Sequence, residues 1–289
     1  MSGASTVPAM DVAERIRAHG ATLTAAERRV AAAILDAPQA VGFGTVADLA
    51  RAASVGAASV VRLATKLGFE GYSDLQESIQ RDLTHQLRPA AERIHEGVDE
   101  GRSEHLVTEL ANVRASVEAA GDEDVHSVVG RLSDLDRPVT VLSGEASSGV
   151  AMQFVGQLQQ LRGSVSLLGG SDVTVHRDIA VLSESATAIV IDLRRYERWV
   201  LDAHTELHAR GIWSAALTDS MLSPIASTAE VTFVVSAAAV GPFDSHVGTL
   251  SVLNLLASGV AAELRATAAD RLASIETAWS ARGSLTTAD

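Results

Sequence analysis

The sequence predicts a two-domain protein, an all-α domain followed by an α/β domain with a five-stranded parallel sheet. Its 289 residues exceed the roughly 100–200 of a typical single domain. Residues 11–83 show helical patterns without a convincing strand, whereas short apolar runs alternate with helical stretches from residue 138 onward. We therefore expect domains at residues 1–84 and 121–289, joined by a helical linker at 85–120 that packs on the second domain or lies as an ordinary surface helix.

The composition excludes several classes of protein. There is no cysteine, which rules out disulfides, thiolate zinc sites and cysteine nucleophiles. No apolar run approaches the ~18 residues that span a bilayer, and residues 1–5 lack the basic and apolar regions of a secretory signal. We expect a cytoplasmic protein with no membrane partner.

The charge is divided unevenly along the chain. Residues 1–88 hold 9 basic and 9 acidic side chains, whereas the rest hold 14 and 27, which accounts for the whole net charge of -13. An acidic C-terminal part repels nucleic acid at long range. Any contact with DNA must therefore come from the N-terminal part.

The N-terminal domain carries the outline of a helix-turn-helix. Capping boxes, in which a side chain and a backbone N–H three residues apart bond reciprocally, are expected at Thr24 with Glu27, at Thr45 with Asp48 and at Ser73 with Gln76. Between the last two, a turn at residues 54–56 precedes a helix at 57–67, which Gly68 ends.

The helix at residues 57–67 has two different faces. Val60, Leu63, Ala64 and Leu67 share the apolar one, while small and basic residues share the other. This division suits a helix that reads the major groove, with an arginine fork on guanine, although a solvated face of a core helix has the same pattern. The predicted DNA-binding residues are Arg51, Ala58, Ser59, Arg62 and Lys66.

Residues 11–83 resemble the N-terminal domain of the RpiR/MurR family of bacterial transcription regulators. The resemblance rests on LTAAERRVA at 23–31, VADLA at 46–50, SVVRL at 59–63 and KLGFEGY at 66–72. It implies binding to double-stranded operator DNA. Gly56 stands where the family has a capping serine, a change that costs roughly 0.5 kcal/mol or less because glycine is an acceptable N-cap.

The second domain alternates strands and helices, as expected for a parallel sheet covered on both faces. Its ligands should lie at the carboxyl ends of the strands. The expected strands are 139–142, 165–168, 188–191, 213–217 and 231–235, and the expected helices are 147–161, 173–182, 198–209 and one long stretch at 245–279.

This domain resembles the SIS (sugar isomerase) domain that follows in the same family. The resemblance implies phosphosugar binding by a glycine-rich turn after the first strand and a Ser/Thr-rich turn after the third. The sequence departs from both turns. SGEASS at 143–148 places Glu145 where a phosphate is expected, and DLRRYER at 192–198 offers three arginines in place of hydroxyls.

Three interpretations of these turns remain open: an altered anionic effector held by the arginines and serines, an ordinary phosphosugar, or a decayed site whose arginines pair with the acidic surface. The predicted effector-binding residues are Ser143, Gly144, Ser147, Ser148, Asp192, Arg194, Arg195 and Arg198.

The sequence as a whole predicts a homodimeric or homotetrameric transcription regulator that senses a small anionic metabolite such as a sugar phosphate. No cofactor, metal or catalytic residue is expected; His204 and His208 lack a third ligand, and Asp244-Ser245-His246 cannot form a triad. The alternatives are a sugar-phosphate isomerase, with Glu145 or His176 as base, and a constitutive DNA-binding protein whose SIS domain only dimerises.

Overall fold

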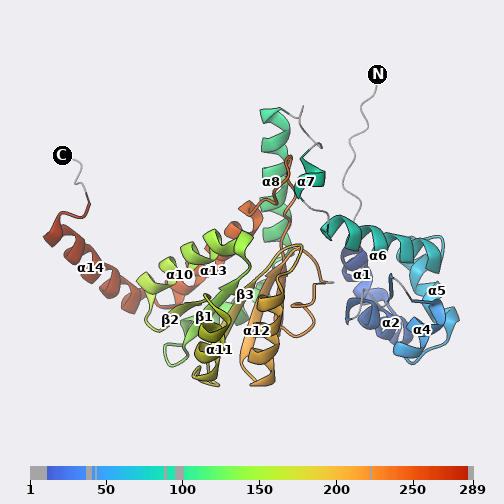
Figure 1. The fold of residues 1–289 in the computed structure, drawn as a ribbon, viewed down its shortest axis with the longest axis horizontal. Coiled ribbons are helices and arrows are strands. Elements are labelled where there is room, and N and C mark those ends of the chain that lie inside the picture. Colours follow the sequence, from blue (N-terminus) through green and yellow to red (C-terminus); the bar gives the residue numbers. More distant parts are fainter. Residues whose placement is uncertain are drawn as a thin grey trace. The chain divides into compact units, whose positions relative to one another are not determined.

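The structure is a computed structural model that describes residues 12–36, 41–42, 44–87, 90–94, 101–221 and 223–285. The chain divides into two compact units (Figure 1). The first contains residues 1–89 with 220–222, and the second contains residues 90–219 and 223–289. We call them the helical unit and the α/β unit.

The helical unit packs short helices around one apolar core. Val60, Leu63, Ala64 and Leu67 are all buried in it, as the helix pattern predicted. Its described elements are α1 (Val12–His19), η1 (Gly20–Thr22), α2 (Ala25–Asp36), α4 (Val46–Ala52), α5 (Ala57–Lys66) and α6 (Tyr72–Leu87).

Two of the three expected capping boxes form. Thr24 bonds with Glu27, and Thr45 bonds with Asp48. The third prediction was wrong, because α6 begins at Tyr72 and already includes Ser73. The Asp74 carboxylate instead accepts a hydrogen bond, 3.0 Å long, from the backbone N–H of Glu70, which ties the chain before α6 to the first turn of this helix.

The α/β unit holds a five-stranded sheet in the order β2-β1-β3-β4-β5, and every neighbouring pair is parallel. This confirms the predicted fold class. Its strands are β1 (Val139–Ser143), β2 (Val165–Leu168), β3 (Thr187–Ile191), β4 (Trp213–Thr218) and β5 (Val231–Val234). Its helices are α7 (Ala90–Arg93), α8 (Arg102–Ala119), α9 (Asp122–Ser133), η2 (Glu145–Ser147), α10 (Ser148–Leu161), α11 (Asp172–Ala180), α12 (Arg198–Ala209), α13 (Val247–Glu263) and α14 (Arg265–Arg282).

Helices cover both faces of this sheet (Figure 1). Val141 and Ile189 belong to the core shared with α9, α10 and α13, whereas Leu142 and Val190 belong to the core shared with α11 and α12. Successive strand residues point to opposite faces, so both sides of the sheet have to be apolar. The continuous apolar runs of the sequence follow from this double coverage.

Four helices refine the expected organisation. α8, expected in the linker, packs on α13 and bonds to the end of the sheet through Asn112 and Ser116. α9 was not expected, although its buried Val128, Val129 and Leu132 follow a helical spacing. The single helix expected at residues 245–279 is two helices, α13 and α14, that meet at Leu264.

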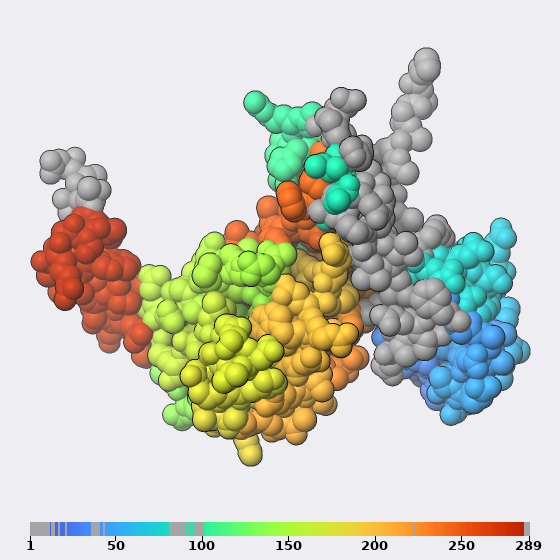
Figure 2. Space-filling view, in the orientation of Figure 1, coloured from blue at the N-terminus to red at the C-terminus, as the bar shows by residue number. Residues whose placement is uncertain are grey.

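Most of helix α14 projects away from the rest of the α/β unit (Figure 2), and Ala268 is its one buried residue. No single helix of the described chain has the length and apolar composition to cross a membrane. α13 and α14 reach them only when taken together, and the chain bends by 102° between the two.

Candidate functional site

The helix-turn-helix consists of α4, a tight turn and α5. Ser54 adopts a left-handed φ of 51° in the turn, and the backbone N–H of Val55 donates to the carbonyl of Ala50. Gly56 is the N-cap of α5 and provides no side-chain bond, as expected from the sequence. Gly68 has a φ of 87° after the last turn, a conformation that favours glycine at this position.

The outer face of α5 is exposed. Ala58 and Arg62 lie on it together with Val61, which is 43% exposed, and Thr65. Ser59 is buried, and its Oγ accepts a hydrogen bond of 2.9 Å from Nη2 of Arg62. Ser59 therefore orients the guanidinium rather than presenting its own hydroxyl to solvent.

The two other predicted basic residues have partners within the helical unit. Nζ of Lys66 lies 3.0 Å from Oε2 of the buried Glu27 and 2.6 Å from the carbonyl oxygen of Thr22. The Thr24 N–H and Lys66 hold the pKa of Glu27 below its usual value. Arg51, exposed on the last turn of α4, donates to Asp48 over 2.9 Å.

In the α/β unit, the strand order reverses at β1. β2 lies on one side of β1 and β3 on the other, so the chain leaves the ends of β1 and β3 in opposite directions. Ligands of doubly wound sheets bind in the crevice beyond such a pair of carboxyl ends. Ser143 pairs with Ile191 here, and the N–H of Gly144 donates to the carbonyl of Ile191 over 3.1 Å.

A carboxylate from the turn after β3 reaches the turn after β1. Oε1 of Glu197 accepts a hydrogen bond from the backbone N–H of Glu145, the first residue of η2. Oε2 accepts one of 2.7 Å from Nε1 of Trp199. The N–H of Glu197 donates in turn to Oδ2 of Asp192 over 2.9 Å. Glu197 thus bonds to the start of the η2–α10 segment through one carboxylate oxygen and to Trp199 of α12 through the other.

Gly144 allows this close approach. A Cβ added to Gly144 would lie 2.5 Å from Oδ1 of Asp192 and 3.0 Å from Oε1 of Glu197. Burial, with Glu197 and Asp219 nearby, raises the pKa of Asp192 to about 7. The residues after β1 and β3 therefore enclose two acidic side chains at the position where the resemblance implies a phosphate.

The three predicted arginines differ in their surroundings. Nε of Arg194 lies 3.4 Å from Oδ2 of Asp219, and its Nη1 lies 3.2 Å from Oδ1 of Asp244. The side chains of Arg195 and Arg198 are exposed and form no hydrogen bond or ion pair within the described part of the chain. Arg194 and Arg195 have left-handed φ values of 31° and 51°. One of the three is therefore tied into the protein, and two remain available.

The predicted serines lie along the turn after β1. Ser143 is buried at the end of the strand. Ser147 is 1% exposed, and its Oγ has no hydrogen-bond partner among the residues that the structure describes. Oγ of Ser148 donates to the carbonyl of Glu145 over 2.7 Å, and the Glu145 side chain is exposed. The carboxylate that contacts this turn is thus that of Glu197, not that of Glu145.

Sequence reasoning missed three residues of this site. They are Glu197, Asp219 and Tyr196, whose hydroxyl donates to Oδ1 of Asp219 over 2.9 Å. Burial and Asp219 raise the pKa of this tyrosine. Asp219 follows β4 directly, so a search for polar residues at the carboxyl ends of strands could have found it.

The histidine pair and the Asp-Ser-His run that were considered in the sequence form no metal site or triad among the described residues. His204 is buried and bonds Oγ of Ser214 over 2.9 Å, and burial lowers its pKa to about 4. His208 is exposed on the same helix. Ser245 donates to Glu109, and Asp244 pairs with Arg93 as well as with Arg194.

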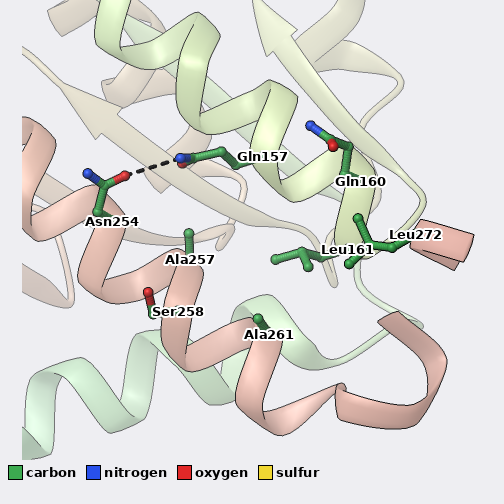
Figure 3. Close-up of a pocket in the computed structure, with 8 residues that line it drawn as sticks. All are labelled: Gln157, Gln160, Leu161, Asn254, Ala257, Ser258, Ala261 and Leu272. Carbon is green, nitrogen blue, oxygen red and sulfur yellow. Dashed lines mark hydrogen bonds between the residues drawn. The ribbon is translucent and has the colours of Figure 1, made fainter. Parts of the chain in front are cut away.

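A cavity of about 330 Å³ lies between α10, α13 and α14 (Figure 3). Gln157 and Asn254 bond across it over 3.1 Å. Its lining side chains are apolar, small or amide-bearing, and no charged residue is among them. This cavity therefore lacks the cations that would hold an anion.

Comparison with known domains fits both units. Residues 10–86 match the helix-turn-helix domain of the rpiR family, and residues 107–259 match the SIS domain. These two domains in this order define a DNA-binding transcriptional regulator with a sugar-isomerase-type domain. The chain belongs to the RpiR family of such regulators.

Relatives support this assignment along most of the chain. The HTH-type transcriptional regulator HexR of Pseudomonas aeruginosa is 26% identical over 255 residues, which cover 86% of this chain and 88% of HexR. The sugar isomerase domain of an RpiR transcription factor from Sphaerobacter thermophilus is 25% identical, with a TM-score of 0.57 over 61% of this chain and 97% of that domain. The NanR protein of Vibrio vulnificus, solved in complex with ManNAc-6P, has the same fold at 20% identity, with a TM-score of 0.55 over 95% of this chain and 99% of NanR.

Proposed function

We propose that this regulator reads an operator with the outer face of α5 and senses a small anionic metabolite at the carboxyl ends of β1 and β3. The proposal that α5 reads DNA is supported by Arg62. This arginine is exposed, is oriented by Ser59, and lies on a helix whose other face is buried. An arginine fork on such a helix matches the O6 and N7 acceptors of guanine. Ala58 and Val61 beside it offer apolar contacts for thymine methyl groups.

The sensing half is supported by the polar groups around the β1–β3 edge. Ser147 has a buried hydroxyl without a partner, and Arg195 and Arg198 are exposed with their guanidinium groups uncommitted among the described residues. Hydroxyls, helix N-termini and arginine forks together suit a phosphate or carboxylate. The Vibrio vulnificus NanR protein, solved with ManNAc-6P, has this fold, so a sugar phosphate is the first effector class to test.

We propose that the SIS domain does not catalyse isomerisation. Isomerisation needs a general base positioned beside the bound sugar. Glu145 has an exposed side chain, and His176 forms a 2.8 Å pair with Glu206 on the outer surface of α11 and α12. The Pseudomonas relative is also named as a transcriptional regulator. A sensor fits these observations better than an enzyme, and we propose that it acts in the cytoplasm.

We also propose that the regulator acts as a homodimer or homotetramer. α8 exposes Leu106, Val107 and Leu110, which are 57%, 64% and 61% accessible in the single chain. Clustered apolar side chains of this kind mark protein–protein contacts. A symmetric assembly would also supply two recognition helices for a palindromic operator.

The experiment that tests the proposal is in vitro selection of genomic DNA fragments by the full chain at physiological salt. We expect enrichment of a palindromic site. Arg62→Ala should bind that site about 1–3 kcal/mol more weakly, whereas Arg282→Ala, which removes an exposed arginine at the end of α14, should bind it normally. A site bound equally by both variants would exclude Arg62 from base reading. A failure to enrich any site, with the fold intact, would contradict the regulator proposal.

A further inference from the structure

The turn after β1 already holds an anion that belongs to the protein. We propose that the Glu197 carboxylate occupies the anion position of the effector site, and that an anionic effector binds only by displacing this side chain. The inference rests on the proposed function, because it concerns the same β1–β3 edge. It makes Glu197 the residue that sets the affinity of the sensor for its effector.

The Glu197 carboxylate lies at the start of the η2–α10 segment. The η2–α10 segment begins one residue after β1, at the strand end where the sheet order reverses and ligands of this fold bind. Helix N-termini attract anions because their first N–H groups lack intrahelical partners. Oε1 of Glu197 accepts from the N–H of Glu145, the first residue of η2. A phosphate oxygen would need this same donor.

Further hydrogen bonds hold the side chain and the backbone of Glu197 in this position. Nε1 of Trp199 donates to Oε2 over 2.7 Å, and the backbone N–H of Glu197 is anchored on Asp192 over 2.9 Å. The absence of a side chain at Gly144 leaves the space that both carboxylates use. A side chain fixed by two donors and an anchored backbone is a built contact rather than a surface rotamer.

The turn before Glu197 has a strained backbone, which favours release of the contact between Glu197 and Glu145. Arg194 and Arg195, in the turn that leads to Glu197, have left-handed φ values of 31° and 51° without being glycine. Such conformations are strained and persist only when the surroundings hold them. Ser147, two residues after the Glu145 N–H that Glu197 occupies, keeps a buried hydroxyl without a partner among the described residues. Displacement of Glu197 would relieve the turn and expose donors to the effector.

Charge decides whether an anion can enter while Glu197 stays. Asp192 lies beside Glu197. Its burial, together with the carboxylates of Glu197 and Asp219, raises the pKa of Asp192 to about 7. A phosphate beside the Glu197 carboxylate and the partly ionised Asp192 would add like charges. An arriving anion and the Glu197 carboxylate therefore exclude each other.

The test is calorimetric titration of the full chain with inorganic phosphate at constant ionic strength. Glu197→Gln keeps the shape and one acceptor but removes the charge, so phosphate should bind at least about tenfold more tightly than to the wild type, a gain of about 1.4 kcal/mol. Glu184→Gln is the matched control, because Glu184 is exposed before β3 and has no partner among the described residues. It should bind phosphate as the wild type does.

Two further variants locate the effect. Ser147→Ala in the Glu197→Gln background should lose most of the gain if phosphate occupies the turn after β1. Trp199→Phe removes one donor that holds Glu197 and keeps every charge, so it should give a smaller gain. This variant also keeps the inference testable if Glu197→Gln fails to fold.

The outcomes separate this inference from the proposed function. Equal phosphate affinity in the wild type and Glu197→Gln, including no binding by either, overturns the role of Glu197. A tenfold gain in Glu197→Gln supports it, even if the operator affinity of the wild type responds to no metabolite. That last result would contradict the sensing proposal alone.

Discussion

The carboxylate of Glu197 accepts a hydrogen bond from the backbone N–H of Glu145, across the ends of the two strands where the sheet order reverses. This contact joins the turn after β3 to the turn after β1. In this chain the turn after β3 carries a carboxylate where the resemblance to SIS domains implies hydroxyls.

The close packing at Gly144 leads to a first prediction. Gly144→Ala places a methyl group 2.5 Å from Oδ1 of Asp192 and 3.0 Å from Oε1 of Glu197, so the carboxylates must shift. We expect the free energy of unfolding to fall by about 1–3 kcal/mol, as for overpacked sites. Urea unfolding of the full chain measures this change.

Gly156→Ala is the matched control for this substitution. Gly156 lies within α10, and an added Cβ meets nothing within 4 Å. This variant should be stabilised by roughly 0.5–1 kcal/mol, because alanine favours a helix interior. Equal unfolding curves for Gly144→Ala and the wild type would show that the two carboxylates do not press on the turn.

The acidity of Asp192 leads to a prediction about pH. Its folded pKa, about 7, lies above the unfolded value near 3.8, so the folded state binds an extra proton between these values. The stability of the wild type should therefore decrease as pH rises from about 4 to 7, by an amount of the order of a few kcal/mol, and then level off. Asp192→Asn should lack this decrease.

The comparison is made by urea unfolding at several pH values between 4 and 8. Other groups titrate in both proteins, so the informative quantity is the difference in unfolding free energy between Asp192→Asn and the wild type. This difference should grow in favour of the variant as pH rises to 7. Asp202→Asn, on the exposed side of α12, should parallel the wild type. Parallel curves for Asp192→Asn would contradict the raised pKa.

The fold could be predicted from the sequence because its signals are local. Runs such as residues 188–191 are apolar and rich in β-branched residues, and Thr24 with Glu27 marks a helix start through one reciprocal pair of bonds. The 102° bend at Leu264 could not be predicted, because no proline or glycine stands there to mark the end of a helix.

The sequence predicted where the two turns lie, but it did not predict the contacts between them. The turns after β1 and β3 were expected to form it, and both lie at the strand-order reversal. The position of Glu197 depends on the backbone of the turn before it, where Arg194 and Arg195 adopt left-handed conformations. Sequence patterns assign such conformations to glycine or asparagine, so two arginines give no warning of them.

The different surroundings of two arginines lead to a further prediction. Arg194→Met leaves Asp219, which is 4% exposed, without its cationic partner, so the unfolding free energy should fall by roughly 2–4 kcal/mol. Arg195→Ala, at an exposed position, should change it by no more than about 0.5 kcal/mol.

Thermal shifts with a panel of sugar phosphates complete this comparison. Arg195→Ala should abolish an effector-linked shift that the wild type shows, because its free guanidinium is a predicted ligand. An undiminished shift would place the ligand elsewhere. If Arg194→Met were as stable as the wild type, the ion pairs with Asp219 and Asp244 would contribute nothing to the fold.

Lys66 could stabilise the fold through Glu27 or contact a DNA phosphate, and its surroundings in the structure favour the first role. Lys66 is the only lysine of the sequence, and its Nζ lies 3.0 Å from the buried Glu27. Lys66→Met should lower the unfolding free energy by about 1–2 kcal/mol, because Glu27 then has no charged partner.

A DNA-binding role would instead appear in the salt dependence of operator binding, whose logarithmic slope falls by about 1 for each phosphate that the protein no longer neutralises. We expect Lys66→Met to keep the slope of the wild type under conditions where it is folded, since its ammonium group is engaged with Glu27 and Thr22. A slope reduced by about 1 with unchanged stability would assign Lys66 to the DNA interface.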